Sequence, residues 1–213
     1  IALPVTAEQS YSPYVDRNYP ENVYWGDTHL HTYLSSDAYL LGTIITPDQA
    51  YRFAKGEAIR ATGGDDVRIR KPLDFLMVAD HAENLGAIPA LVAGNKHLAA
   101  TEHGKKIAAV LAGLPALPDV LRARTRDEFD KGNMAISKAK SAKGGDFGID
   151  DEFKLEVWKQ VVAIAEKHND PGKFTTFAGY EYSSSPPMLH RNVLYAGGPG
   201  DTLKTLPYSK YDS

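Results

Sequence analysis

Apolar runs alternate with helical patterns along this chain, and the alternation predicts an α/β fold. A nearly continuous apolar run at 73–79 is typical of a strand that is covered on both faces of a parallel sheet. The run at 23–25 predicts the end of a buried strand within 22–31, and a third strand is predicted at 174–180. The order strand, helix, strand favours parallel strands with helical crossovers.

Helical patterns lie between these strands. Thr46 and Pro47 form the start signal of a helix that runs to about Ile59. Apolar residues recur every three or four positions over 153–164, behind a capping aspartate, and predict another helix. Small polar residues and glycines predict a loop at 32–39 and turns at 63–66 and 197–200.

The length of 213 residues predicts one domain, at 22–213, with an insertion. Residues 1–21 carry prolines and tyrosines without apolar periodicity, which indicates an extended lead-in on the surface. Residues 84–150 are mostly helical in pattern, with apolar stripes at 107–114 and 117–129. We interpret them as a helical insertion packed on the main body.

Composition narrows the classes of partner and ligand. The formal net charge of −3 argues against a nucleic-acid partner, which would call for a basic face. No apolar run approaches the roughly 18 residues of a membrane span, so we expect no membrane partner. The chain has no cysteine, so nitrogen and oxygen must bind any metal.

Four of the seven histidines stand at the ends of predicted strands. His29 and His31 project to the same side, because residues two apart share one face of a strand. His81 follows the second strand, and His190 begins a fourth at 190–195. Imidazoles that converge where strands end predict a divalent-metal site, since α/β folds keep their chemistry at such ends.

Acidic residues accompany these histidines. Asp37 lies in the loop after His31 and is either a ligand or a turn-forming residue. Glu181 follows the third strand, and a carboxylate among imidazoles can bridge two cations about 3.5–4 Å apart. Asp27 and Asp80 are predicted to fix imidazole tautomers by hydrogen bonding, with Asp80 a direct ligand as the alternative.

The other three histidines are given no metal role. His97 and His103 have no acids at ligand spacing, and we assign them to solvated helix faces. His168 lies near the end of a helix, where it suits the helix dipole.

The segments around the four strand-end histidines resemble the motifs of a known family. Residues 26–32 (Gly-Asp-Thr-His-Leu-His-Thr) resemble the first motif of the PHP (polymerase and histidinol phosphatase) metal-dependent phosphoesterases, and residues 79–81 (Ala-Asp-His) resemble the second. Residues 179–181 (Gly-Tyr-Glu) resemble the strand with the bridging glutamate, and His190 resembles the next ligand. The closer match is to a large, mostly bacterial, often exported branch without an assigned function. That branch implies a periplasmic or secreted location, with a cytoplasmic one as the alternative.

The resemblance implies an incomplete, PHP-like distorted (β/α)7 barrel with a helical insertion. It also implies two or three divalent cations, such as Zn, Mn or Fe, of which Glu181 bridges two. The implied ligands are His29, His31, Asp37, His81, Glu181 and His190. Asp37 stands where the family usually has a histidine. The family takes further histidines from later strands, and no histidine follows His190 here. We therefore expect the C-terminal remainder of the same protein as a partner.

The predicted function is divalent-metal-dependent hydrolysis, most specifically of a phosphate ester of a small molecule. A metal-bound water with its pKa lowered to ~7 would be the nucleophile. Arg191 would hold phosphoryl oxygens, although a structural salt bridge is an equal alternative. The same core could hydrolyse an amide, a carboxylic ester or a sulfate ester, and a chain short of ligands could be a non-catalytic metal-binding fragment.

Overall fold

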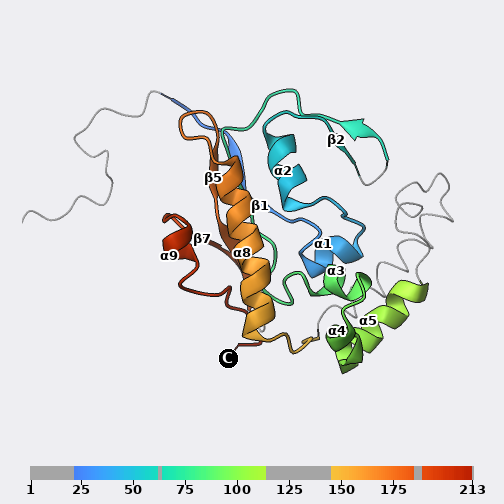
Figure 1. Cartoon of the computed structure of the whole chain (residues 1–213). Coiled ribbons are helices and arrows are strands. Elements are labelled where there is room, and N and C mark those ends of the chain that lie inside the picture. Colours follow the sequence, from blue (N-terminus) through green and yellow to red (C-terminus); the bar gives the residue numbers. More distant parts are fainter. Residues whose placement is uncertain (1–21, 62–63, 114–144, 185–188, 213) are drawn as a thin grey trace, which may run out of the picture.

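The computed structural model describes residues 22–61, 64–113, 145–184 and 189–212. They form a mixed α/β structure with a parallel sheet and helices (Figure 1), as the sequence predicts. The three parallel strands are, in spatial order, β1 (Gly26–Leu30), β4 (Phe75–Val78) and β5 (Thr175–Phe177). Within the described ranges this sheet is open, so the barrel itself stays a prediction.

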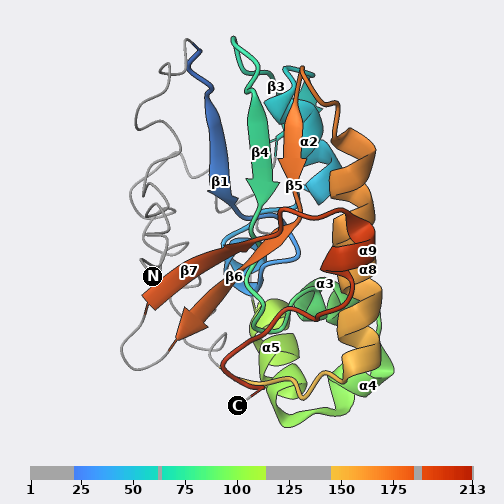
Figure 2. The same ribbon diagram turned by 90° about the vertical axis from the view of Figure 1, so that its left-hand side faces the viewer.

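Two helices cover one face of the sheet (Figure 2). They are α2 (Pro47–Ala54) and α8 (Asp151–His168). Thr46 and Gln49 form a complete capping box at the start of α2, and Asp150 accepts a hydrogen bond from the Phe153 N–H at the start of α8. Both predicted helix starts are therefore confirmed.

Strand β4 is the centre of the core. Leu76, Met77 and Val78 are at most 1% exposed, as the predicted doubly covered strand requires. Leu76 and Val78 pack against Tyr51 of α2 and Ala165 of α8. Each such side chain stabilises the fold by about 1.5–3 kcal/mol through burial, which anchors the strand before His81.

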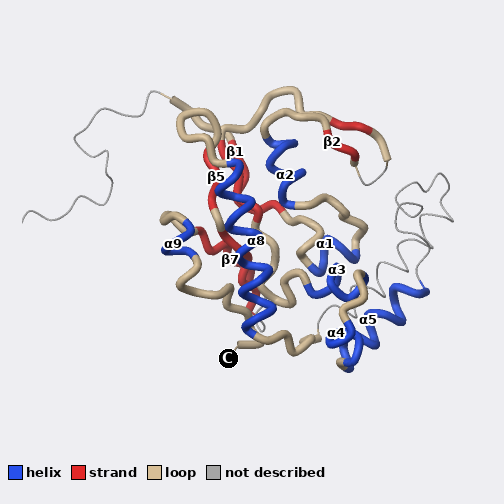
Figure 3. The backbone as a smooth tube through the Cα atoms, in the orientation of Figure 1, coloured by secondary structure: helices blue, strands red, loops and turns tan. Residues whose placement is uncertain are grey.

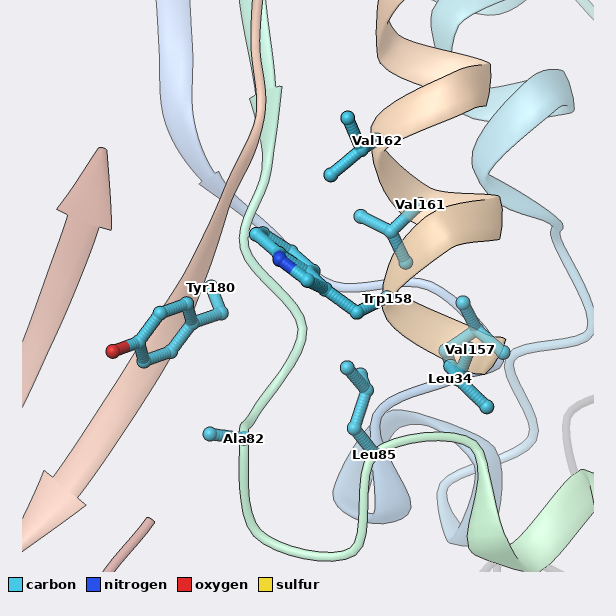
Figure 4. Close-up of a cluster of buried hydrophobic side chains, with 8 residues drawn as sticks. All are labelled: Leu34, Ala82, Leu85, Val157, Trp158, Val161, Val162 and Tyr180. Carbon is cyan, nitrogen blue, oxygen red and sulfur yellow. The ribbon is translucent and has the colours of Figure 1, made fainter. Parts of the chain in front are cut away.

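A second apolar cluster surrounds Trp158, the largest fully buried side chain (Figure 4). The indole N–H donates to the Thr202 carbonyl over 3.3 Å, and the ring meets that of Tyr180 edge to face at 6.0 Å. Leu34 and Leu85 pack in the same cluster. Because they follow the first and second strands, the cluster fixes the loops just beyond the histidines.

The chain leaves the parallel sheet at Ala178 and enters a hairpin. Strand β6 (Gly179–Ser184) pairs antiparallel with β7 (Leu189–Leu194). A Cβ at Gly179 would lie 2.3 Å from Met77 Sδ, so only glycine lets β6 pass this close to β4. The single strand predicted at 174–180 is therefore two strands. The fourth strand predicted at 190–195 is present as β7, antiparallel to β6.

The prediction of a buried first strand is wrong. Strand β1 pairs only with β4 among the described strands and forms the edge of its sheet. Val23, Tyr24 and Trp25 precede it with 62–73% of their surface exposed. An apolar run shows which residues can be buried, but neighbouring strands decide whether they are.

The structure also differs from the local predictions at four places. The loop predicted at 32–39 contains helix α1 (Ser36–Leu40), and the turn predicted at 197–200 leads into the short helix α9 (Pro199–Thr202). Helix α2 ends before Gly56, whose φ of +84° does not continue a helix. The next residues form a missed antiparallel pair, β2 (Ile59–Arg60) with β3 (Asp66–Val67).

The described residues after β4 form three helices, in agreement with the helical pattern of this segment, and they lie together beyond the ends of the parallel strands (Figure 2 and Figure 3). They are α3 (Ala87–Val92), α4 (Lys96–Ala100) and α5 (Glu102–Gly113). His103 is buried against Phe147, with ring centroids 4.7 Å apart, so its assignment to a solvated face is wrong. The predicted lead-in at 1–21 and stripe at 117–129 lie outside the described residues.

None of the helices described combines the length and apolar character needed to cross a bilayer.

Candidate metal centre

Glu181 lies in the middle of a histidine cluster where β1 and β4 end. Its side chain is fully buried. Its Oε2 lies 2.9 Å from His29 Nε2 and 2.6 Å from His31 Nε2, and its Oε1 contacts His190 Nδ1. One oxygen thus faces the imidazoles of the first strand segment, and the other faces the hairpin.

Two aspartates fix the peptide that carries His29 and His31. Asp27 Oδ1 accepts the backbone N–H of His29 over 2.7 Å. Buried Asp80 accepts the Thr32 N–H over 2.5 Å and the Thr32 hydroxyl over 2.6 Å. Both aspartates were expected to fix imidazole tautomers, with Asp80 as a direct ligand in the alternative. The hydrogen bonds observed are to backbone N–H groups and to the Thr32 hydroxyl, and the roles toward a metal stay predictions.

Asp37 joins His31 to His81. Its Oδ1 lies 3.4 Å from His31 Nδ1, and its Oδ2 lies 3.4 Å from His81 Nε2. It also lies in the first turn of α1, where it accepts the Ala38 N–H over 2.7 Å and the Ser35 hydroxyl over 2.6 Å. The ligand and helix-turn alternatives for Asp37 are therefore compatible with one position.

The six predicted ligands lie in three overlapping groups, each with its ligand atoms within 4.8 Å of one another. The groups are His29, His31 and Glu181; His31, Asp37 and His81; and His81, Glu181 and His190. This set of nitrogen and oxygen donors suits a divalent cation. A neutral imidazole offers one lone pair, so the first two groups compete for His31.

Carboxylates set the charge of this cluster. Burial lowers the pKa of His81, but the carboxylates of Asp37 and Glu83 outweigh it and raise the pKa to about 9. Burial raises the pKa of Glu181, but the histidines, His29 first among them, bring it below its usual value. Without a cation, the raised pKa of His81 favours a proton on its ring at neutral pH, beside these acids. A divalent cation can replace that proton, which couples metal binding to pH.

Sequence reasoning missed two residues of the cluster. The Ser183 hydroxyl lies 2.9 Å from His81 Nδ1 and 3.1 Å from His190 Nδ1. Glu83 accepts the Ser183 N–H over 3.2 Å, and its other oxygen lies 3.6 Å from His81 Nδ1. The strand period of two relates Ser183 to Glu181, so alternation along β6 was the signal that could have found it.

The hairpin reaches β1 through Asn192. Its side-chain amide donates to the Thr28 carbonyl over 2.8 Å. His190 lies on the same face of β7 as Asn192, so this contact also brings His190 to the cluster. Alternation directs exposed Arg191 to the opposite face, where Tyr182 is its cross-strand partner. Its contact with a phosphoryl group stays a prediction.

The cluster is buried on one side and open on the other. The side chains of His31 and His81 are 18% and 12% exposed, whereas those of His29 and His190 are 50% and 40% exposed. A ligand from solution would therefore approach past His29 and His190.

Comparison with known proteins gives a family but no activity. No curated protein matches the sequence, and no solved structure does. One family covers residues 18–213, which is most of the chain. The chain therefore belongs to the family described as "Protein of unknown function (DUF3604)".

Proposed function

We propose that this protein binds divalent cations at the cluster around Glu181 and hydrolyses an ester of a small molecule, most specifically a phosphate ester. The observation that carries the proposal is the placement of Glu181. A fully buried carboxylate that faces imidazoles through both oxygens is arranged to hold two cations close together. A structural role alone would not call for four histidines around one buried acid.

The proposal includes a PHP-like barrel. Three parallel strands with helices on one face, and a cluster where the strands end, agree with such a barrel. Strand β1 has a free edge among the described strands, where further strands of the same protein would join. Those strands would also bring the late histidines that the resemblance implies.

The residues of the cluster have two proposed roles, which are to bind the cations and to leave an entrance for the ester. When bound, divalent cations stabilise the charge that develops on phosphoryl oxygens and lower the pKa of water. Glu181, His31 and His81 would hold the cations from the buried side, and His29 and His190 would complete the set of donors. His29 and His190 flank the open side, where the ester enters.

Two alternatives remain to be tested alongside this function. The same donors can polarise the carbonyl of an amide or ester, or a sulfate ester. A non-catalytic metal-binding role is the second alternative, in which the same donors hold a cation and no ester is turned over.

The test begins with metal-free protein that is reloaded with Mn²⁺, Zn²⁺ or Fe²⁺. Bound metal is measured by elemental mass spectrometry. Turnover is measured with chromogenic phosphomonoesters, phosphodiesters, carboxylic esters and sulfate esters. We expect at least one tightly bound cation and metal-dependent phosphoester turnover, both lost in Glu181→Gln and kept in Glu166→Gln, an exposed site on α8. Turnover of other esters alone would remove the phosphoesterase proposal, and absence of bound metal would remove the centre.

A further inference from the structure

Another buried carboxylate, that of Glu83, lies beside the Nδ1 side of the His81 ring, away from Asp37. Glu83 is only 8% exposed. Its Oε1 accepts the Ser183 N–H, but its Oε2 has no hydrogen-bond partner among the residues the structure describes. That oxygen lies 3.6 Å from His81 Nδ1. A buried carboxylate oxygen without a hydrogen-bond donor is energetically unfavourable, which suggests that a donor faces it in the functional state of the protein.

The two nitrogens of His81 face different surroundings. Nε2 faces Asp37 Oδ2 at 3.4 Å and Glu181 Oε2 at 3.7 Å, which are ligand atoms of the proposed centre. Nδ1 faces Glu83 Oε2 and the Ser183 hydroxyl. A histidine that ligates through one nitrogen carries a proton on the other, and that proton needs an acceptor.

The two neighbours of Nδ1 differ in what they can accept or donate. The Ser183 hydroxyl can do either, so it fits both tautomers of His81. An ionised carboxylate can only accept, so Glu83 fits the tautomer with its proton on Nδ1. That tautomer leaves the lone pair of Nε2 directed at the proposed centre.

We propose that Glu83 is a positioning residue, which in the metal-loaded protein accepts a hydrogen bond from the Nδ1–H of His81 and thereby presents Nε2 to the cation. This inference rests on the proposed metal-binding function. The bond from Ser183 N–H to Glu83 Oε1 also ties the loop after β4 to β6, the strand that carries Glu181. Glu83 thus sets both the tautomer of one ligand and its place relative to another.

The first test is a nitrogen-15 NMR spectrum of Zn²⁺-loaded wild-type protein, which reports the nitrogen that carries the proton in each histidine. We expect the His81 proton on Nδ1. A proton on Nε2 with zinc at Nδ1 would overturn the inference even if no variant folds.

The second test measures Co²⁺ affinity and the visible spectrum of the bound ion. In Glu83→Gln the amide N–H₂ can donate to Nδ1 and favour the wrong tautomer. We expect Co²⁺ affinity to fall about 10–100-fold and the spectrum to shift. Glu83→Asp keeps an acceptor and should recover part of the affinity. Ser183→Ala should change affinity less than about threefold, because the hydroxyl is not the required acceptor.

The outcomes separate the two proposals. Wild-type protein that binds neither ion would overturn the metal-binding function, and this inference with it. Wild-type binding with equal affinity and spectrum in Glu83→Gln would overturn this inference alone. A larger loss in Ser183→Ala than in Glu83→Gln would assign the positioning role to the serine instead.

Discussion

The inner and outer sides of the histidine cluster are built differently. Glu181, His31 and His81 come from segments that pack against the core, and their side chains are 0%, 18% and 12% exposed. His29 lies on an edge strand and His190 on an exposed hairpin strand, with 50% and 40% exposure. Folding therefore places the three inner side chains, whereas the two outer histidines are less constrained by their surroundings.

This difference leads to separate expectations for stability and for metal affinity. A change on the inner side should reduce both, because the same contacts hold the fold and the ligands. A change on the outer side should reduce metal affinity alone. The following variants test that division, from the largest expected change in unfolding free energy to the smallest.

Glu181→Ala should have the largest effect. It removes a fully buried carboxylate and leaves three imidazoles facing a cavity, so the free energy of unfolding of metal-free protein should fall by roughly 3–5 kcal/mol. Co²⁺ binding should be lost at the same time. Urea unfolding and a Co²⁺ titration measure the two effects. Unchanged stability would show that the inner side is not held by this acid.

Leu40→Ala tests whether the core supports the inner ligands from a distance. Leu40 ends α1, the helix whose first turn carries Asp37, and it is fully buried. Truncation should cost about 2–5 kcal/mol and weaken Co²⁺ binding, because α1 loses its anchor. Ile44→Ala is the control, since Ile44 is 50% exposed and its truncation should stay within about 0.5 kcal/mol. Full Co²⁺ affinity in folded Leu40→Ala would separate Asp37 from the core.

The residues that the structure brings to the cluster were largely readable from the sequence. In a chain without cysteine, histidine, aspartate and glutamate are the main side chains that can bind a metal. Strand alternation directs His29 and His31 to one side. The mixed α/β content followed from the doubly covered run at β4. These are local signals, and each depends on the order of residues within one strand.

What sequence reasoning missed depends on contacts between distant segments. Glu83 and Ser183 meet only because β6 bends away at Ala178 and crosses the end of β4. The exposure of Trp25 depends on which strand lies beside β1, not on its own side chain. Such pairings between segments 50 to 150 residues apart leave no periodic signal in either segment.

His29→Ala should reduce metal affinity with little effect on the fold. The ring is half exposed and lies on an edge strand, so the unfolding free energy should change by less than about 1 kcal/mol. Co²⁺ affinity should nevertheless fall at least about tenfold, because one donor is lost from the group around Glu181. His97→Ala, an exposed histidine on α4, should change neither quantity. A loss of stability as large as that in Glu181→Ala would contradict the proposed division.

Asp48→Asn should have the smallest effect and gives a pH test at the contact between α2 and α8, outside the histidine cluster. Asp48 of α2 lies 2.6 Å from Lys167 Nζ and 2.9 Å from His168 Nε2 of α8, and these partners hold its pKa below the usual value. Because the folded-state pKa is lowered, this stabilisation is present above pH ~4 and is lost as the pH falls through the lowered pKa. The Lys167 side chain is 66% exposed, so the loss of unfolding free energy in Asp48→Asn at pH 7 should stay below about 1 kcal/mol.

Urea unfolding of wild type and Asp48→Asn at pH 7, 5 and 3 measures the gap in unfolding free energy between the two proteins. This gap should shrink only at the lowest pH, while Co²⁺ affinity at pH 7 stays equal. A gap that widens on acidification would contradict the sign, and a change in Co²⁺ affinity would show that the helical face and the metal centre are coupled.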